Sequence, residues 1–214
     1  MTRTAIDDTE FVVRIIATTA VENERYFGDL DAVVGDGDFG YSLARGFEKI
    51  LLDWDNFDRT DPGTFLLKIA VAITSRIGGT SGPIWGTAFM RAGTGLKGTD
   101  SPTRADVVRA LRASIEGIKT RGNSDVGDKT LLDAIVPAVD ALEQSIADGD
   151  DSATALDRVA SVARQAADAT IEMQAKRGRA SYSGERSIGS VDPGAVAVAV
   201  IAERVAAEWK ARTP

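Results

Sequence analysis

Residues 30–40 read LDAVVGDGDFG, and this stretch places three carboxylates in one glycine-rich turn directly before a helical pattern. Unpaired, the side chains of Asp31, Asp36 and Asp38 would repel one another, and the usual resolution is a bound divalent cation or a raised pKa. Carboxylate oxygens are hard ligands, so magnesium or calcium is favoured over zinc or copper. The glycines allow a tight turn and a close approach to a ligand. The stretch therefore predicts a metal site, with an exposed Asp-Gly turn as the simpler alternative.

A second Asp-Gly-Asp tripeptide, at residues 148–150, serves as an internal control. It lies between two helical patterns and is followed by Asp151 and Ser152, which is typical of a loop with a helix cap. We interpret this second site as structural. The EF-hand pattern does not fit residues 30–40, because its alternating ligand positions and closing Glu are absent.

The composition is that of one globular domain, which we place at residues 1–214, with 43% hydrophobic and 27% charged residues. A formal net charge of −7 argues against nucleic-acid binding, which needs a cationic surface. The chain has no cysteine and no histidine, which excludes disulfides, thiolate metal sites and every Ser-His or Cys-His nucleophile. No apolar stretch is long enough to span a bilayer, and residues 1–8 lack the apolar core of a signal peptide. We therefore expect a cytoplasmic protein.

Helical periodicity dominates the sequence and predicts an all-α fold of eight helices, and the glycine-rich segments between them suggest a bundle with a ligand site at one end. Asp61-Pro62 and Asp192-Pro193 each pair a capping residue with proline at the first helical position, and residues 101–106 contain a cap before an acidic first turn. The alternation of alanine and valine at residues 195–200 would suit a strand, but it follows an Asp-Pro start and continues into a strong helix former. We therefore assign it to a helix. The predicted helices are 8–27, 39–55, 62–77, 82–95, 104–120, 128–147, 152–175 and 193–211.

Two further glycine-rich loops precede helices. Residues 78–86 read GGTSGPIWG, and the free amides at such a helix start could bind an anion, although a tight helix connection is the simpler interpretation. In residues 121–134, Asp128 is expected to cap a helix whose first turn carries Lys129 and Thr130. A lysine there opposes the helix dipole unless an anion is near, and on composition alone we expect it to reach solvent.

Residues 176–194 form a long loop with four cationic side chains in an otherwise acidic protein. This local reversal of charge is typical of a lid over phosphate. A solvated linker is the alternative.

The order of these loops resembles one family, the nucleotide-binding L subunit, or C-terminal domain, of the dihydroxyacetone kinases. The matching blocks are LDAVVGDGDFG at 30–40, GGTSGPIWGTAF at 78–89, GDKTLLDAI at 127–135 and GRASYSGERSIGSVDPGA at 178–195. The resemblance implies an eight-helix antiparallel barrel that holds ADP or ATP with two Mg²⁺ ions at one end. It further implies that Asp31, Asp36 and Asp38 are the metal ligands. The positions that fall where the family contacts nucleotide are Phe39, Gly40, Tyr41, Ser42, Thr80, Ser81, Gly122, Leu131, Arg179, Asp192, Pro193 and Gly194.

The implied activity is phosphate transfer to a short keto sugar held on a separate sugar-binding K-type subunit. Such transfer needs positioning and charge neutralisation rather than a strong base, so no catalytic residue beyond the metal and phosphate ligands is expected. Members divide between ATP users and those whose bound ADP is rephosphorylated by a phosphotransferase-system protein. Dihydroxyacetone, glyceraldehyde and a tetrulose are all candidate sugars.

One departure from the family pattern concerns Phe39, where His or Thr is common. Its side chain cannot coordinate metal or hydrogen-bond phosphate, so only a backbone contact is expected there. Two other hypotheses stay open: a non-catalytic ADP-binding regulatory module and a helical domain that metal stabilises without binding nucleotide.

Overall fold

The computed structural model describes residues 3–212, so Met1, Thr2, Thr213 and Pro214 lie outside it. The expectation that residues 1–8 are not a signal peptide therefore falls partly outside the described residues. Within this range the chain forms nine α-helices and three short 3₁₀ helices and no strand. The predicted all-α class is therefore confirmed. None of the helices in the described range is long and apolar enough to cross a membrane.

The chain divides into two compact units, each made of two separate stretches. Unit 1 combines the residues up to Val21 with Ser42–Asn123, and unit 2 combines Glu22–Tyr41 with Ser124–Pro214. That the two units form one domain stays a prediction. Unit 1 holds α1 (Ala5–Glu22, up to Val21), most of α3 (Phe39–Leu52), η1 (Trp54–Asn56), α4 (Pro62–Arg76), α5 (Ser81–Leu96) and α6 (Arg104–Gly122). Unit 2 holds α2 (Glu24–Asp31), α7 (Leu132–Asp148), α8 (Ser152–Ala169), η2 (Thr170–Glu172), η3 (Arg179–Ser187) and α9 (Pro193–Arg212).

Unit 1 is built around α5, which packs between α4 and α6. Phe47 of α3 contributes an aromatic cluster to this core, with its ring centroid 6.1 Å from that of Trp85 and 6.4 Å from that of Phe89. On α1, the Arg14 guanidinium lies 4.2 Å above the Trp54 ring, a cation–π contact that ties this helix to η1.

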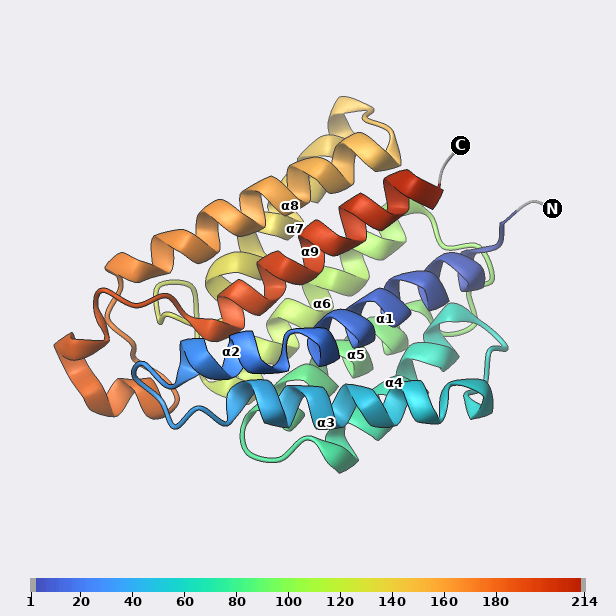
Figure 1. Ribbon diagram of the computed structural model, residues 1–214. Coiled ribbons are helices and arrows are strands. Elements are labelled where there is room, and N and C mark those ends of the chain that lie inside the picture. The colour runs from blue at the N-terminus through green and yellow to red at the C-terminus, as the bar shows by residue number, and fades with distance from the viewer. Residues whose placement is uncertain (1–2, 213–214) are drawn as a thin grey trace. The chain divides into compact units, whose positions relative to one another are not determined.

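Unit 2 is built from α7, α8 and α9, with α2 packed on α9. In Figure 1, α8 and α9 run side by side, and α2 lies beside α9. The facing surfaces are rich in buried alanine, including Ala163, Ala167 and Ala197, and such small side chains let helix axes approach closely. Phe27 of α2 is fully buried and fixes this short helix, which carries Asp31 at its end.

Three of the correctly predicted helix starts are each marked by a side-chain cap. The Asp61 carboxylate accepts from the Thr64 N–H at 2.9 Å, Thr103 forms a capping box with Asp106, and Asp192 accepts from the Ala195 N–H at 2.7 Å. The stretch 195–200 is helical, as predicted.

Several predicted boundaries were wrong. The predicted helix 8–27 is interrupted at Asn23, whose φ of −103° and ψ of 16° leave the helical region, and the chain continues as α2. The helices predicted to end at 55 and 175 end at Leu52 and Ala169, each followed by a short 3₁₀ turn. The helix predicted to start at 128 starts at Leu132, for reasons given below.

Candidate metal and nucleotide site

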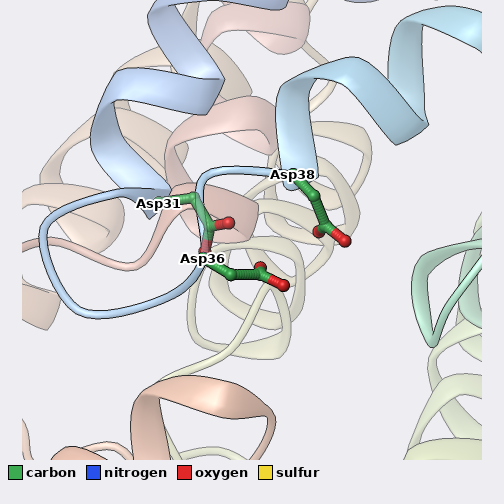
Figure 2. Close-up of side chains that lie close together, drawn as sticks. All are labelled: Asp31, Asp36 and Asp38. Atoms are coloured by element: carbon green, nitrogen blue, oxygen red, sulfur yellow. The ribbon is translucent and has the colours of Figure 1, made fainter.

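The three predicted metal ligands converge within unit 2. Asp31 is the last residue of α2, Asp36 lies in the following turn, and Asp38 immediately precedes α3. Each offers a carboxylate oxygen, and these oxygens all lie within 4.8 Å of one another. Figure 2 shows the three side chains gathered at the turn between the two helices. This spacing is short enough for a single cation to contact all three groups.

Backbone geometry forces the three carboxylates together. The Gly35 N–H donates to the Asp31 carbonyl at 2.6 Å, and Gly37 adopts a φ of +75°, which favours glycine. The Phe39 N–H then donates to the Asp31 carboxylate at 3.3 Å, so the start of α3 is tied to the end of α2. The side chain of Phe39 packs on Phe27, with ring centroids 6.1 Å apart. Phe39 therefore serves the packing of the turn, which accounts for an apolar residue at this position.

Negative charge is only partly compensated in the cluster. The Arg179 guanidinium lies with Nε 2.7 Å from Oδ2 of Asp36. Removal from water raises the pKa of Asp38, the nearby Asp36 carboxylate raises it further, and Arg179 opposes the rise. Three carboxylates facing one cation make a site that gains from a divalent ion.

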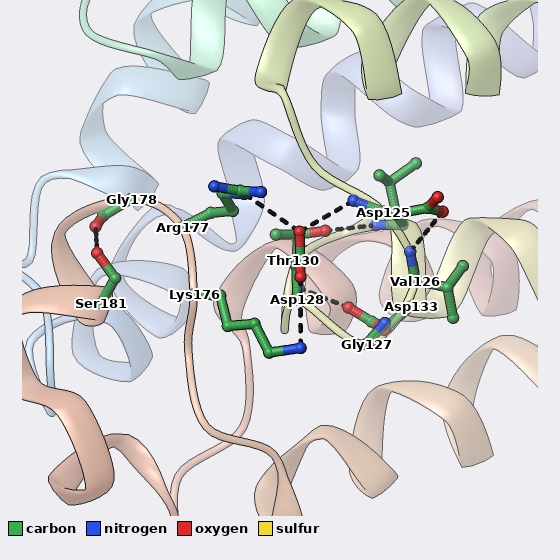
Figure 3. Close-up of polar contacts among 11 residues, drawn as sticks. Asp125, Val126, Gly127, Asp128, Thr130, Asp133, Lys176, Arg177, Gly178 and Ser181 are labelled. Atoms are coloured by element: carbon green, nitrogen blue, oxygen red, sulfur yellow. Dashed lines mark hydrogen bonds and ion pairs between the residues drawn. The ribbon is translucent and has the colours of Figure 1, made fainter.

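The cationic segment 176–187 is held by contacts within unit 2. The Arg177 Nε–H donates to Oδ2 of Asp128 at 3.1 Å, and Oδ1 of Asp128 lies 3.5 Å from the Lys176 Nζ (Figure 3). The Asp128 carbonyl also accepts from the Lys176 N–H at 3.1 Å. Burial opposes ionisation of Asp128, but the Asp125 N–H and the Arg177 guanidinium outweigh it and hold the pKa below its usual value. The segment is thus anchored at its beginning rather than free in solvent.

Lys129 does not reach solvent, contrary to the sequence-based expectation. Its side chain is buried, with 3% of the residue exposed, and Nζ donates to the carbonyls of Met173 at 3.1 Å, Ser190 at 2.7 Å and Ser187. Its φ of +60° is left-handed, so the helix cannot include this residue. This conformation explains why α7 begins only at Leu132.

Asp133 completes the loop before α7. Its buried carboxylate accepts from the Gly127 N–H at 2.5 Å and from the Thr130 N–H at 2.7 Å. Asp128, expected to cap the helix, instead accepts from the Asp125 N–H at 3.1 Å and anchors Arg177. The roles of Asp128 and Lys129 were missed from the sequence, because Arg177 and the carbonyls that Lys129 binds lie far along the chain. The role of Asp133 was also missed, although its partners lie within six residues.

Asp192 stands at the start of α9 beside Leu131. A Cβ built on Gly194 would lie 3.4 Å from the Leu131 Cβ, so these predicted nucleotide contacts are neighbours. Removal from water, opposed in part by the Ala195 N–H, raises the pKa of Asp192 to about 7, and the nearby Asp133 contributes to the rise.

The structure therefore brings some predicted site residues together within unit 2. Arg179 meets the acidic cluster, and Leu131 meets the start of α9. Phe39, Gly40 and Tyr41 form the first turn of α3 in the same unit. The remaining predicted contacts belong to unit 1: Ser42 in α3, Thr80 and Ser81 at the start of α5, and Gly122 at the end of α6.

Similar proteins identify the family. The chain is 39% identical over 181 residues to the ADP-binding subunit DhaL of the PEP-dependent dihydroxyacetone kinase of Escherichia coli, covering 85% of this chain and 86% of that subunit. It is 36% identical over 182 residues to the corresponding subunit of kinase 1 of Listeria innocua, covering 84% and 85%. It is also 37% identical over 192 residues to the L-erythrulose 1-kinase of Mycolicibacterium smegmatis, covering 89% of this chain but 33% of that enzyme.

Solved structures support the same family assignment. The crystal structure of the dihydroxyacetone kinase of C. freundii matches 94% of this chain with a TM-score of 0.73 and 26% identity, and this chain spans 34% of that kinase. The same kinase in complex with AMP-PNP and Mg²⁺ matches equally well, with a TM-score of 0.73. The DAK2 domain family matches residues 33–207, and the chain therefore belongs to this family.

Proposed function

We propose that this chain is the nucleotide-carrying subunit of a kinase that phosphorylates a short keto sugar held on a separate protein. The observation that carries the proposal is the convergence of Asp31, Asp36 and Asp38, with their oxygens within 4.8 Å of one another, in a DAK2 fold. The relatives named above are kinases or kinase subunits, which supports a kinase subunit here. Those of similar length are ADP-binding subunits, which supports a chain that works with a partner.

The donor set fits magnesium. All three groups are carboxylates, the turn that carries them is partly exposed, and Arg179 neutralises only part of their charge. Such hard oxygen ligands suit Mg²⁺, which when bound neutralises the charge of the transferred phosphoryl group. We propose that these residues would hold two Mg²⁺ ions when nucleotide is bound. The AMP-PNP and Mg²⁺ complex of the similar C. freundii kinase supports a site for magnesium and nucleotide.

The chain's own residues position the nucleotide. We propose that the Asp trio orients the metal-bound phosphates and that the Arg179 guanidinium, beside Asp36, contacts a phosphate. The further proposed nucleotide contacts are Phe39, Gly40, Tyr41, Ser42, Thr80, Ser81, Gly122, Leu131, Asp192, Pro193 and Gly194.

The names of the relatives support a proposal for the phosphoryl donor and the partner. The similar subunits of E. coli and L. innocua are named as PEP-dependent and ADP-binding, whereas the erythrulose kinase is about three times the length of the matched region. We propose that the chain keeps ADP bound, that a phosphotransferase-system protein rephosphorylates it, and that a K-type subunit presents the sugar. Dihydroxyacetone is the proposed acceptor, and erythrulose is the alternative.

Calorimetric titration of ADP tests the nucleotide site. Binding in Mg²⁺ that disappears in EDTA is expected. The Asp36→Asn variant should weaken Mg²⁺-dependent ADP binding by at least about tenfold, because substitution of even an outer-shell partner of a metal costs that much. The matched control is Asp150→Asn, in the second Asp-Gly-Asp tripeptide, where the carboxylate lies 3.8 Å from Arg158 and binding should not change. Tight ADP binding that survives Asp36→Asn contradicts the metal assignment.

Reconstitution tests the catalytic role. The chain, a K-type sugar-binding protein and a phosphoryl donor should together convert dihydroxyacetone to its phosphate. Stable association without turnover would instead support a non-catalytic ADP-binding module.

A further inference from the structure

Lys129 has no role in the chemistry proposed above, although its burial and backbone conformation are both unfavourable. It is 3% exposed, and its φ of +60° is one that a lysine rarely adopts. A left-handed backbone is unfavourable for a non-glycine residue and persists only where its surroundings hold it. The chain therefore retains an energetically costly arrangement at this position.

The ammonium group is satisfied by carbonyl oxygens. A lysine has three N–H donors, and those of Lys129 go to the carbonyls of Met173, Ser187 and Ser190. With its donors used in this way, Lys129 has none to offer a phosphate. The anion-binding role that its position near a helix start suggested is therefore not the one that its contacts support.

The three carbonyls lie at the two ends of one loop, residues 174–189, which we call the arm. Met173 precedes the arm, Ser187 is near its end, and Ser190 follows it, so one ammonium group closes its base. Two further contacts cross the base: the Ala175 N–H donates to the Ser187 hydroxyl at 2.9 Å, and the Gly189 N–H donates to the Ile171 carbonyl at 2.8 Å.

The arm reaches the acidic cluster beyond this base. Arg179, in the arm, contacts Asp36 at 2.7 Å, and the Ser183 hydroxyl donates to the Val34 carbonyl at 3.4 Å in the same turn. Closing the base shortens the flexible part of the loop and lowers the entropy that must be lost when Arg179 is fixed. A group that is already in place binds its ligand more tightly than one that must first be ordered.

We propose that Lys129 is a positioning residue that closes the base of the arm and thereby holds Arg179 over the acidic cluster before nucleotide arrives. An ammonium group suits this role because it has three N–H donors and can hydrogen-bond three carbonyls from two segments at once. This inference rests on the proposed function in one respect, that Arg179 contacts bound nucleotide. The effect of Lys129 on the arm itself does not depend on it.

Hydrogen exchange of the ligand-free protein measures the arm directly. In Lys129→Ala and in Lys129→Met, which keeps most of the apolar volume, amides of residues 174–189 should exchange at least about tenfold faster. Amides of α8 should keep their rates, which shows that the variants fold. Lys97→Ala, at an exposed lysine of unit 1, is the matched control and should leave the arm unchanged. Unchanged exchange of the arm in a folded Lys129 variant overturns the proposal.

Chemical rescue separates the ammonium from the space it fills. Propylammonium supplies the atoms that Lys129→Ala removes and should restore slow exchange of the arm, whereas n-propanol of similar size should not. Lys129→Met occupies most of the space of the lysine side chain and should not respond to either compound. Equal rescue by both compounds would show that the lysine only fills space and would overturn the proposal.

A double-mutant comparison tests the route through Arg179. Lys129→Met should raise the Kd for ADP in Mg²⁺ by about tenfold in the wild-type background, and by less than about twofold when Arg179 is already glutamine. Equal losses in both backgrounds would overturn action through Arg179. If the wild-type protein binds no ADP, the proposed function fails, but the exchange and rescue experiments still decide whether Lys129 closes the arm.

Discussion

Replacing Gly40 with alanine would place a methyl group against the backbone of α2. The Cβ would lie 2.0 Å from the Glu24 carbonyl oxygen and 2.6 Å from the Gly28 nitrogen. Both atoms belong to the main chain of a helix, so no side-chain rotation can make room. The first turn of α3 would have to move away from α2, and with it Asp38 from Asp31.

The size of the effect follows from two opposing terms. Overpacking costs about 1–3 kcal/mol, and two backbone contacts this short place Gly40→Ala at the upper end, about 3 kcal/mol. Alanine recovers about 1 kcal/mol of helix propensity relative to glycine. The net loss is therefore about 2 kcal/mol, which for a chain of this length lowers Tm by about 4–8 °C.

Urea unfolding followed by far-ultraviolet circular dichroism measures this loss, with Gly95→Ala as the matched control. A Cβ on Gly95, in α5, would lie 3.7 Å from Ala110, an ordinary contact, so this variant should gain about 0.5–1 kcal/mol. The Gly40→Ala protein should also bind Mg²⁺ more weakly, because its three carboxylates no longer converge. Equal stability of the two variants would refute the close approach of α3 to α2.

Two further predictions concern charge. Arg179→Gln should tighten binding of Mg²⁺ alone by up to about fivefold, since an exposed ion pair with Asp36 is worth at most about 1 kcal/mol. The same variant should weaken binding of ADP in the presence of Mg²⁺. Titrations in which the two affinities change in the same direction contradict this prediction. Asp192 has a folded-state pKa of about 7, above its usual 3.8, so the folded state binds more protons and this residue lowers stability as the pH rises from about 4 to 7. The amide oxygen of Asp192→Asn can still accept from the Ala195 N–H. The free energy of unfolding of this variant, relative to wild type, should therefore increase as the pH rises from about 4 to 7 and stay constant above that. A difference in urea unfolding that does not depend on pH contradicts the raised pKa.

Local chemistry was predictable from the sequence. The caps at Asp61 and Thr103 and the tight turn at residues 35–40 depend on neighbours within a few residues, and the structure has them as predicted. The convergence of Asp31 with Asp36 and Asp38 is of the same kind, because one turn joins them. That Arg179 pairs with Asp36 across more than a hundred residues was not accessible to spacing, and only the family resemblance placed it near the nucleotide.

Lys129 shows why the remainder was missed. Its partners lie 44, 58 and 61 residues further along the chain, and they are backbone carbonyls, which every residue possesses. No side-chain pattern can identify such partners. The left-handed backbone of Lys129 is incompatible with the helix predicted to start at 128, so this one residue accounts for both the wrong helix start and the wrong exposure.

Three locally unfavourable features of unit 2 lie on segments that are in contact with one another. Three carboxylates crowd one turn, Lys129 is buried with a positive φ, and the pKa of Asp192 is raised to about 7. The arm connects them, since its base is held by Lys129 and its Arg179 meets Asp36, while Asp192 follows two residues after Ser190. Their location on connected segments is what a site prepared in advance for a charged ligand requires, since its own groups must stay crowded and ordered while the ligand is away.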